Sequence, residues 1–425
     1  MQVFLTGATG FIGGRILSKL VAAGHQVTCL LRGAGAVAVM QMEWPQVRVV
    51  QGEFTQPGQW ADAVAGHDVV INAVGIIRQT SQASFQAVHT DAPLALFEAA
   101  KRGGVKKVVQ ISACGADEQA ASQYHTTKRA ADEALKRLGL PFVVLRPSFV
   151  YGPGDQSMTF FRSLAALPLT LVPGDGQYRV QPVQVDDLAQ AVLLAVEKVE
   201  LQGVFDVGGA DALTFDEMLD ELARTLGKPT ARKWHVPWSV MQAVAKLTDL
   251  CGGRGPISGE ELGMLRRGNE ADIQPFVAAF GFRPCRFAAG LARNRVTTAE
   301  LWAARLAHLR VPLRCSIAFI WLATGIISMC FSAVQGYELL EDVGITGPLA
   351  DVSLYGTSLL EIAMGLATLF GIRVRWMGMI QLVLMAGFMA ILTFGTPELW
   401  LHPFGPLTKN IPIIAGTLVM MAWHE

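Results

Sequence analysis

The stretch Thr6-Gly7-Ala8-Thr9-Gly10-Phe11-Ile12-Gly13 decides the fold of this chain. It follows a short segment, Gln2 to Leu5, that predicts a buried strand, and it precedes apolar residues that recur at helical spacing from Ile12 to Val21. Glycines spaced Gly-x-x-Gly-x-x-Gly between a strand and a helix let the backbone turn tightly and approach a pyrophosphate, which the helix N-terminus attracts. Residues 6–13 therefore predict a dinucleotide-binding loop; the alternative is a Gly-rich turn of purely structural use.

A second apolar segment, Val27 to Leu31, predicts a strand that ends at Arg32. Dinucleotide folds that prefer NAD place an acidic residue here for the ribose hydroxyls, whereas an arginine suits the 2′-phosphate of NADP. No Asp or Glu lies between Gly13 and Arg32. The sequence therefore predicts NADP (NADPH) in preference to NAD; the alternative is a solvated arginine at a strand end.

The alternation of strands and helices continues to residue 145. Apolar segments predict further strands at 47–51, 69–73, 107–112 and 142–145. Helical periodicity predicts helices at 58–65, 93–101 and 124–138. This order predicts an α/β fold with a doubly wound parallel sheet. Ligands of such sheets lie beyond the carboxyl ends of the strands, where we expect Gly7, Arg32, Ala73, Ser112 and Arg146 to converge.

Ser112, Tyr124 and Lys128 are the candidate catalytic residues. Tyr124 and Lys128 are four residues apart, so they share one face of the predicted helix. A lysine beside a phenol lowers the pKa of the tyrosine, which makes Tyr124 a usable acid or base for a carbonyl or hydroxyl. Ser112, at the preceding strand end, can hydrogen-bond the same oxygen. A Tyr-x-x-x-Lys pattern also arises by chance, so its position in the fold carries the prediction.

These motifs resemble the short-chain dehydrogenase/reductase superfamily. The resemblance lies in residues 6–13, Asn72-Ala73-Val74-Gly75, Ser112 and Tyr124-x-x-x-Lys128. It implies that Ser112, Tyr124 and Lys128 are catalytic, with Lys128 also on the nicotinamide ribose. It also implies a set of cofactor-binding residues at the strand ends, of which Gly7, Gly10 and Gly13 hold the pyrophosphate. The full set is Thr6, Gly7, Thr9, Gly10, Phe11, Ile12, Gly13, Arg32, Glu53, Phe54, Asn72, Ala73, Val74, Gly75, Lys128, Arg146, Pro147 and Ser148.

Later stretches narrow the resemblance, which covers about residues 1–300. Residues 145–155 and 182–188 are similar to the extended, epimerase/dehydratase-like branch. Residues 110–117 look most like the atypical group that contains the nucleotide-binding accessory subunit of respiratory complex I and its bacterial relatives. Two departures matter: Glu53 replaces the expected Asp near the adenine, and the short interval from Ser112 to Tyr124 counts against a sugar-nucleotide substrate. Members of the atypical group can retain the catalytic residues without known turnover.

The C-terminal hundred residues are strongly apolar, which explains the 51% hydrophobic and 16% charged composition. Residues 315–337, 349–371 and 376–397 are long enough to span a bilayer. A fourth apolar run, residues 411–423, is shorter and reaches spanning length only if it starts near Leu407. Basic residues precede the first span, Arg373 and Arg375 lie between the spans 349–371 and 376–397, and Glu338, Glu341 and Asp342 make the intervening loop acidic. The positive-inside rule therefore predicts a multi-pass protein of the cell inner membrane with its nucleotide-binding domain in the cytoplasm.

Four spans of this size resemble the DoxX-like membrane family, which is associated with quinone-linked redox chemistry. The expected domains are a Rossmann NAD(P)-binding domain (1–150), an interleaved substrate lobe (151–300) and a DoxX-like domain of four helices (311–425). Glu361 lies in mid-span, where it is either functional or a protonated side chain bonded to a neighbouring helix. The cluster Trp234, Pro237, Trp238 and Met241 is core, a substrate contact or a membrane-surface contact.

Two functions from different classes remain open. The first is a membrane-anchored NAD(P)H-dependent oxidoreductase acting on a lipid-soluble carbonyl, hydroxyl or quinone-related substrate, with the lipid bilayer as its second partner. The second is a non-catalytic NADPH-binding assembly or stability subunit of a membrane respiratory complex. The formal net charge of zero predicts no nucleic-acid partner, and the six cysteines lack zinc-site spacing, so no metal is expected.

Overall fold

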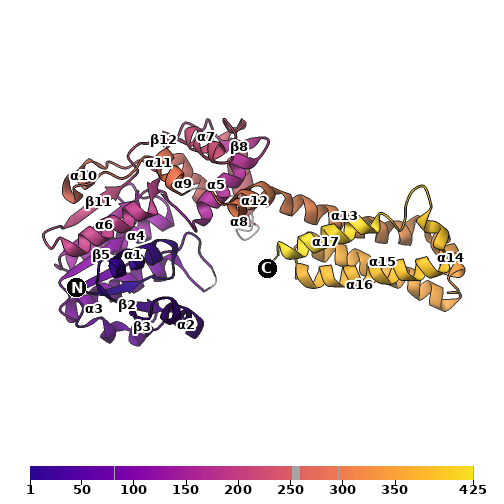
Figure 1. Ribbon diagram of the computed structural model, residues 1–425, viewed down its shortest axis with the longest axis horizontal. Coiled ribbons are helices and arrows are strands. Elements are labelled where there is room, and N and C mark those ends of the chain that lie inside the picture. The colour runs from indigo at the N-terminus through magenta and orange to yellow at the C-terminus, as the bar shows by residue number, and fades with distance from the viewer. Residues whose placement is uncertain (81, 251–258, 295, 425) are drawn as a thin grey trace. The chain divides into compact units, whose positions relative to one another are not determined.

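The computed structural model describes residues 1–80, 82–250, 259–294 and 296–424. Contacts between residues divide the chain into two compact units, Met1–Ala304 and Arg305–Glu425. The first unit is α/β and the second is helical (Figure 1).

A seven-stranded parallel sheet is the centre of the first unit. Its strands are β1 (Gln2–Thr6), β2 (Gln26–Leu31), β3 (Arg48–Gln51), β4 (Val69–Asn72), β5 (Lys107–Ile111), β6 (Phe142–Pro147) and β11 (Gly203–Val207). The order is β11-β6-β5-β4-β1-β2-β3, so the direction of winding reverses between β1 and β4. In such a sheet the ligand crevice lies at this reversal, which places the loop after β1 at its centre.

Helices cover both faces of the sheet because the side chains of each strand alternate between two apolar layers. One layer packs the sheet against α1 (Phe11–Ala22), α6 (Val185–Glu197) and α10 (Gln274–Phe280). The other packs it against α3 (Ala92–Arg102) and α4 (Gln123–Arg137). Phe4 faces the second layer, whereas its neighbours Val3 and Leu5 face the first. The doubly wound sheet predicted from the sequence is confirmed.

Three local features differ from the predicted elements. The helix expected at 58–65 is two short 3-10 segments, Pro57–Gln59 and Ala61–Val64. The sequence prediction missed α2 (Ala34–Glu43), whose apolar residues follow no helical face. A π-helical turn, Gln86–Asp91, precedes α3 and places His89 in the interior.

The rest of the first unit forms a smaller lobe with its own apolar core. It contains α5 (Gln156–Ala166), α7 (Phe215–Thr225), α8 (Trp238–Leu250), α9 (Gly259–Arg267), α11 (Phe287–Arg293) and α12 (Thr298–Leu306). Three strand pairs complete it: β7 (Val150–Tyr151) with β10 (Val183–Gln184), β8 (Thr170–Pro173) with β13 (Lys233–Val236), and β9 (Arg179–Val180) with β12 (Leu213–Thr214). We refer to this part as the second lobe.

The second unit is a helical bundle of α13 (Arg310–Cys330), α14 (Ala333–Asp342), α15 (Pro348–Leu369), α16 (Val374–Gly395) and α17 (Asn410–Ala422). Short 3-10 segments lie at Ala307–Leu309 and Pro397–Trp400. By length and composition three of the described helices can cross a membrane, Thr298–Cys330, Pro348–Leu369 and Val374–Gly395; α17 is shorter. The first predicted span therefore ends at Cys330 instead of Tyr337, because the helix is interrupted there before α14 begins.

Two glycines allow α13 and α15 to pack closely in this bundle. A Cβ on Gly325 would lie 2.7 Å from the Ser358 carbonyl oxygen and 3.1 Å from the Glu361 Cβ. A Cβ on Gly365 would lie 2.6 Å from Leu322. Glu361 is half-buried at this crossing and hydrogen-bonds the Thr324 side chain of α13. Its surroundings favour the interhelical contact over a free mid-span carboxylate.

Candidate functional site

The loop from Thr6 to Gly13 is shaped to admit a backbone-bound ligand. Gly7 has φ +81°, and a Cβ there would lie 2.8 Å from the backbone of Ala73. A Cβ on Gly13 would lie 2.0 Å from the Gly7 carbonyl oxygen, so this position accepts only glycine. Thr9 and Gly10 are exposed, Phe11 and Ile12 are half-buried. The loop therefore offers bare backbone at the reversal point of the sheet, as a pyrophosphate requires.

The N-terminus of α1 adds a favourable electrostatic field. Gly10 is its N-cap and makes no side-chain cap hydrogen bond, and the first turn contains no acidic residue. The N–H groups of a first helical turn have no partner within the helix and carry partial positive charge. An anion beside Gly10 would meet that charge, so these residues fit the diphosphate of a nicotinamide dinucleotide.

Asn72 links three strands beneath the loop. Its Oδ1 accepts hydrogen bonds from the Thr6 hydroxyl at 2.8 Å and from the Val74 amide at 3.2 Å. Its Nδ2 donates to Gln110 Oε1 at 2.8 Å. The side chains of Thr6 and Asn72 are buried, so they position the backbone of Ala73 and Val74 at the crevice.

Arg32 and Glu53 lie at the ends of neighbouring strands, β2 and β3. Arg32 Nε lies 3.8 Å from Glu53 Oε2, and 78% of the Arg32 side chain is exposed. A pair so long and so exposed contributes little to stability, so the guanidinium remains available to a phosphate. The ring of Phe54, another predicted cofactor-binding residue, is buried and stacks on Trp60 with a centroid distance of 5.9 Å.

Ser112 and Arg146, at the ends of β5 and β6, form a polar cluster with the buried Asp132 of α4. The Ser112 hydroxyl donates to Asp132 Oδ2 at 2.7 Å, and Arg146 Nε donates to the same oxygen at 3.1 Å. Burial raises the pKa of Asp132 to about 6, although the Ser112 hydrogen bond and the Arg146 charge act in the opposite direction. The sequence prediction missed Asp132; its signal is its place four residues after Lys128 on the same helical face.

Lys128 is buried between two strand ends. Its Nζ donates to the carbonyl oxygens of Val74 at 3.2 Å and Ile111 at 3.1 Å. A Cβ on Gly75 would lie 3.2 Å from Nζ, so the absence of a side chain at Gly75 leaves room for the ammonium beside the segment after β4. Burial lowers the pKa of Lys128 to about 8.

Tyr124 lies one turn before Lys128 on α4 and differs from its predicted state. Burial raises its pKa to about 12, whereas the sequence predicted a lowered pKa. The physical reason is that Lys128 donates to backbone carbonyls; no hydrogen bond among the described residues joins the Tyr124 hydroxyl to Lys128 or Ser112. At neutral pH the phenol therefore holds its proton and is an acid.

His89 is a further buried group beside Tyr124, with a ring-centroid distance of 5.3 Å. Burial, assisted by the charge of Lys128, lowers the pKa of His89 to about 3, so the ring is neutral. Its Nε2 accepts a hydrogen bond from the Ile76 amide at 3.0 Å, which orients the segment after β4. No sequence pattern indicated this residue, because the π-helical turn that places it has no simple periodicity.

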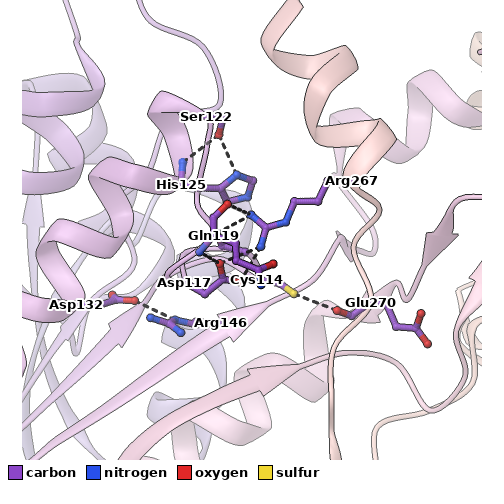
Figure 2. A network of polar contacts seen from close by, with 10 residues as sticks. Cys114, Asp117, Gln119, Ser122, His125, Asp132, Arg146, Arg267 and Glu270 are labelled. Atoms are coloured by element: carbon purple, nitrogen blue, oxygen red, sulfur yellow. Dashed lines mark hydrogen bonds and ion pairs between the residues drawn. The ribbon is translucent and has the colours of Figure 1, made fainter. Parts of the chain in front are cut away.

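Helix α9 of the second lobe covers the N-terminus of α4. Glu260 Oε1 accepts a hydrogen bond from the Tyr124 amide at 2.9 Å, and Glu261 pairs with Arg78 at 2.7 Å. Figure 2 shows Arg267 reaching into the loop after β5, where it bonds both carboxylate oxygens of Asp117 at 2.8 and 2.9 Å. These pairs fix the second lobe over the candidate catalytic helix.

Pro147 and Ser148 complete the predicted set at the end of β6. Both are buried. The Ser148 hydroxyl donates to the Gln181 carbonyl oxygen, and its amide donates to Val207 at 2.9 Å. These bonds tie β6 to β11 and to the second lobe, so the residues shape the crevice wall. The structure thus brings together the Gly loop, Ala73, Lys128, Ser112 and Arg146 along the carboxyl ends of adjacent strands.

Comparisons with known proteins identify both parts of the chain. Residues 7–163 match the NAD(P)H-binding family, and residues 318–418 match the DoxX-like family. A ceramide reductase of Caulobacter vibrioides is 28% identical over 229 residues, which cover 53% of this chain and 70% of that protein. The mitochondrial NADH dehydrogenase [ubiquinone] 1 alpha subcomplex subunit 9 of Arabidopsis thaliana is 27% identical over 260 residues, 59% of this chain. The chain spans 64% of that relative's length.

Solved structures show the same fold. The Bordetella bronchiseptica enzyme WbmH in complex with NAD+ superposes with a TM-score of 0.54 at 18% identity, over 72% of this chain and 98% of that one. MoeE5 in complex with UDP-glucose and NAD gives 0.53 at 20% identity, over 72% and 99%. The predicted resemblances are confirmed: residues 7–163 are similar to the NAD(P)H-binding family and have a Rossmann-like fold, and residues 318–418 are similar to the DoxX-like family.

Proposed function

We propose that this protein is a membrane-anchored NADPH-dependent oxidoreductase that reduces a carbonyl of a lipid-soluble substrate. The observation that carries the proposal is the cluster of Ser112, Asp132 and Lys128 at the carboxyl ends of β4 and β5, beside the glycine loop. A bound nicotinamide supplies a hydride to the substrate carbon. Everything else in the reaction falls to side chains of this chain.

Tyr124 is the proton donor in this proposal. As hydride reaches the carbonyl carbon, the electron pair of the C=O bond moves to oxygen, which takes the phenolic proton. A phenol with a raised pKa holds that proton until charge develops on the substrate oxygen. Lys128 stabilises the resulting phenolate and, with its Nζ beside Gly75 in the segment after β4, binds the nicotinamide ribose. Ser112 orients the substrate oxygen.

NADP is the proposed form of the cofactor. Arg32 stands at the end of β2 with its guanidinium exposed and only a long contact to Glu53. Its planar N–H groups match the oxygens of a 2′-phosphate. The diphosphate would lie on Gly7, Gly10 and Gly13, and the residues Thr6, Asn72, Ala73 and Val74 would form the floor of the crevice.

A lipid substrate is proposed because two reductases are relatives and because the chain carries membrane-capable helices. One relative is named a ceramide reductase, and the other, from Stenotrophomonas maltophilia, a 2-alkyl-3-oxoalkanoate reductase. A long-chain keto lipid, or a quinone, reaches such a site from the bilayer. The basic residues before the first predicted span, with Arg373 and Arg375 between the next two spans, support a first unit on the cytoplasmic side of the inner membrane.

A second candidate is a non-catalytic NADPH-binding subunit of a membrane respiratory complex. The relationship to the subunit of Arabidopsis supports it. The experiment that separates the two follows NADPH absorbance with full-length protein in detergent, using long-chain 3-oxo lipids, a quinone and short-chain analogues. Turnover with a long-chain compound supports the oxidoreductase. NADPH that stays bound through purification without any turnover supports the binding subunit.

A further inference from the structure

Helix α8 has an apolar face that is largely exposed among the described residues of the first unit. At 100° per residue its surface divides into three arcs. Ala245 and Thr248 are buried against the second lobe, whereas Ser239, Gln242, Lys246 and Asp249 form an exposed polar arc. The third arc holds Val240, Ala243, Val244 and Leu247. Leu247 is 62% exposed and Val240 49%, so this arc meets solvent or a partner instead of the core.

The strand pair that precedes α8 exposes apolar side chains as well. β8 and β13 pair in parallel with Leu171 opposite Trp234. These two residues are 56% and 62% exposed, and Leu169, two positions before Leu171, shares their face of the pair. The sequence alone did not decide whether this Trp-containing cluster lies in the core or at the surface. In the structure Trp234 lies at the surface. Several large apolar side chains exposed in one lobe mark an interaction site.

The same lobe carries the point from which the chain enters the membrane. Val172 of β8, Ala231 and Ala304 of α12 belong to one apolar core. Eleven residues lead from Ala304 to Cys315, where the first uncharged run begins. Even fully extended, they reach no further than about 40 Å, so the chain holds the second lobe near the bilayer. Trp302 on α12 is a further exposed aromatic in this lobe.

We propose that the apolar arc of α8, together with the outer face of β8 and β13, rests in the headgroup region of the bilayer. An interfacial helix buries its apolar face at the acyl boundary and turns its polar face to water, and the arc with Lys246 fits that requirement. Trp234 suits the same depth, since indole favours the membrane interface. This surface would bring the second lobe, and with it the crevice wall, to the level at which a lipid leaves the bilayer.

The bilayer is a more favourable partner for this surface than a second copy of the chain, because the second lobe is covalently linked to the membrane-capable helices. The second lobe stays within about 40 Å of the bilayer, because eleven residues link its core to a helix that can cross a membrane. A second copy would have to displace a surface that is always present at high local concentration. The inference does not depend on catalysis, because it uses only the exposed residues and the membrane-capable helices.

The test uses full-length protein in nanodiscs of phosphatidylcholine and phosphatidylglycerol. A photoreactive benzophenone amino acid replaces Leu247 in one sample and the neighbouring Lys246 in another. Both positions are exposed on the same helix, but on different arcs, so neither replacement disturbs the core. After irradiation, mass spectrometry measures lipid adducts on the protein.

We expect at least about five-fold more lipid adduct at position 247 than at position 246, because only the first faces the acyl region. Equal adducts at the two positions, or no lipid adduct at 247, would overturn the proposal. A product of twice the protein mass at 247 would assign the surface to a second copy. NADPH binding, measured in the same samples, reports separately on the proposed function, so failure of one inference is distinguishable from failure of the other.

Discussion

The hydroxyl of Ser112 donates its only proton to Asp132 Oδ2, 2.7 Å away, at the floor of the crevice. A hydroxyl has one proton to give, so while Asp132 is ionised Ser112 can offer a substrate only its lone pairs. When Asp132 is protonated, the carboxyl can donate to Ser112, which frees the serine proton for a carbonyl oxygen. Asp132 therefore decides whether Ser112 acts as donor or acceptor toward the substrate.

This arrangement predicts a pH dependence of catalysis. The pKa of Asp132 is raised to about 6, so the carboxyl is neutral below that pH and ionised above it. We expect kcat/KM for carbonyl reduction to rise as pH falls through about 6, and kcat/KM for oxidation of the corresponding alcohol to fall. Steady-state kinetics from about pH 5 to about pH 8 would measure both directions.

Asp132→Asn should abolish the change in kcat/KM near pH 6, because an amide does not titrate. Its control is Glu133→Gln, which alters the next residue and only its surface pair with Lys136. The control should keep the wild-type profile. If kcat/KM still changes near pH 6 in Asp132→Asn, another group controls the reaction, and the assignment to Asp132 would be wrong.

Tyr124→Phe should reduce turnover by about 10²- to 10⁴-fold, since it removes the proton donor. NADPH affinity should stay unchanged, because the ring and its contacts with Phe85 and His89 remain. Turnover and equilibrium binding, measured on the same preparation, separate the two effects. Wild-type turnover in the variant would remove Tyr124 from the mechanism.

Gly13→Ala tests the glycine loop against a matched neighbour. The added methyl would lie 2.0 Å from the Gly7 carbonyl oxygen, so the loop must move; at Gly14 the nearest atom is 3.4 Å away, an ordinary contact. We expect Gly13→Ala to weaken NADPH binding by more than about tenfold, or about 1.4 kcal/mol, and Gly14→Ala to leave it nearly unchanged. Equal affinities in both variants, measured by titration, would place the dinucleotide elsewhere.

Arg32→Ala tests the choice of cofactor. The variant should lose about 10- to 100-fold in affinity for NADPH, because a charged hydrogen bond to phosphate contributes about 1.5–3 kcal/mol, while its affinity for NADH stays the same. Binding of both nucleotides to detergent-solubilised protein provides the comparison. An equal loss for the two nucleotides would contradict recognition of the 2′-phosphate by Arg32.

Gly325→Ala should destabilise the membrane bundle by about 1–3 kcal/mol, because the added Cβ would meet the Ser358 carbonyl oxygen at 2.7 Å. Gly356→Ala on α15 is the control, since nothing lies within 4 Å of its Cβ. Thermal unfolding in detergent measures both. Glu361→Gln should behave like the control, because an amide retains the contact with Thr324. Normal stability of Gly325→Ala would disprove the close crossing of α13 and α15.

The sequence predicted those parts of the site that depend on local pattern. The glycine loop, the strand ends and the spacing from Tyr124 to Lys128 follow from chain-local periodicity, and the structure places them along one edge of the sheet. The partners of these residues could not be predicted in the same way. Asp132 and Arg146 belong to different elements, and their pairing depends on how β6 lies beside β5.

The prediction of a lowered pKa for Tyr124 was wrong for the same reason. Spacing put a lysine on its helical face, but the direction of the Lys128 ammonium is set by the carbonyl oxygens of Val74 and Ile111 at two strand ends. Burial then acts on the phenol without compensation and raises its pKa. Likewise, the contact of Glu260 with the Tyr124 amide joins residues 136 apart in sequence, which no local pattern reveals.

The most direct measurement follows a deuterium label from NADPH deuterated at the transferable position of the nicotinamide. Full-length protein in detergent is mixed with this cofactor and a long-chain 3-oxo lipid, and mass spectrometry locates the label in the product. The account predicts one deuterium on the former carbonyl carbon with wild-type protein, and a rate lower by about 10² or more with Tyr124→Phe. Tightly bound NADPH that transfers no deuterium to any lipid carbonyl or quinone would contradict it.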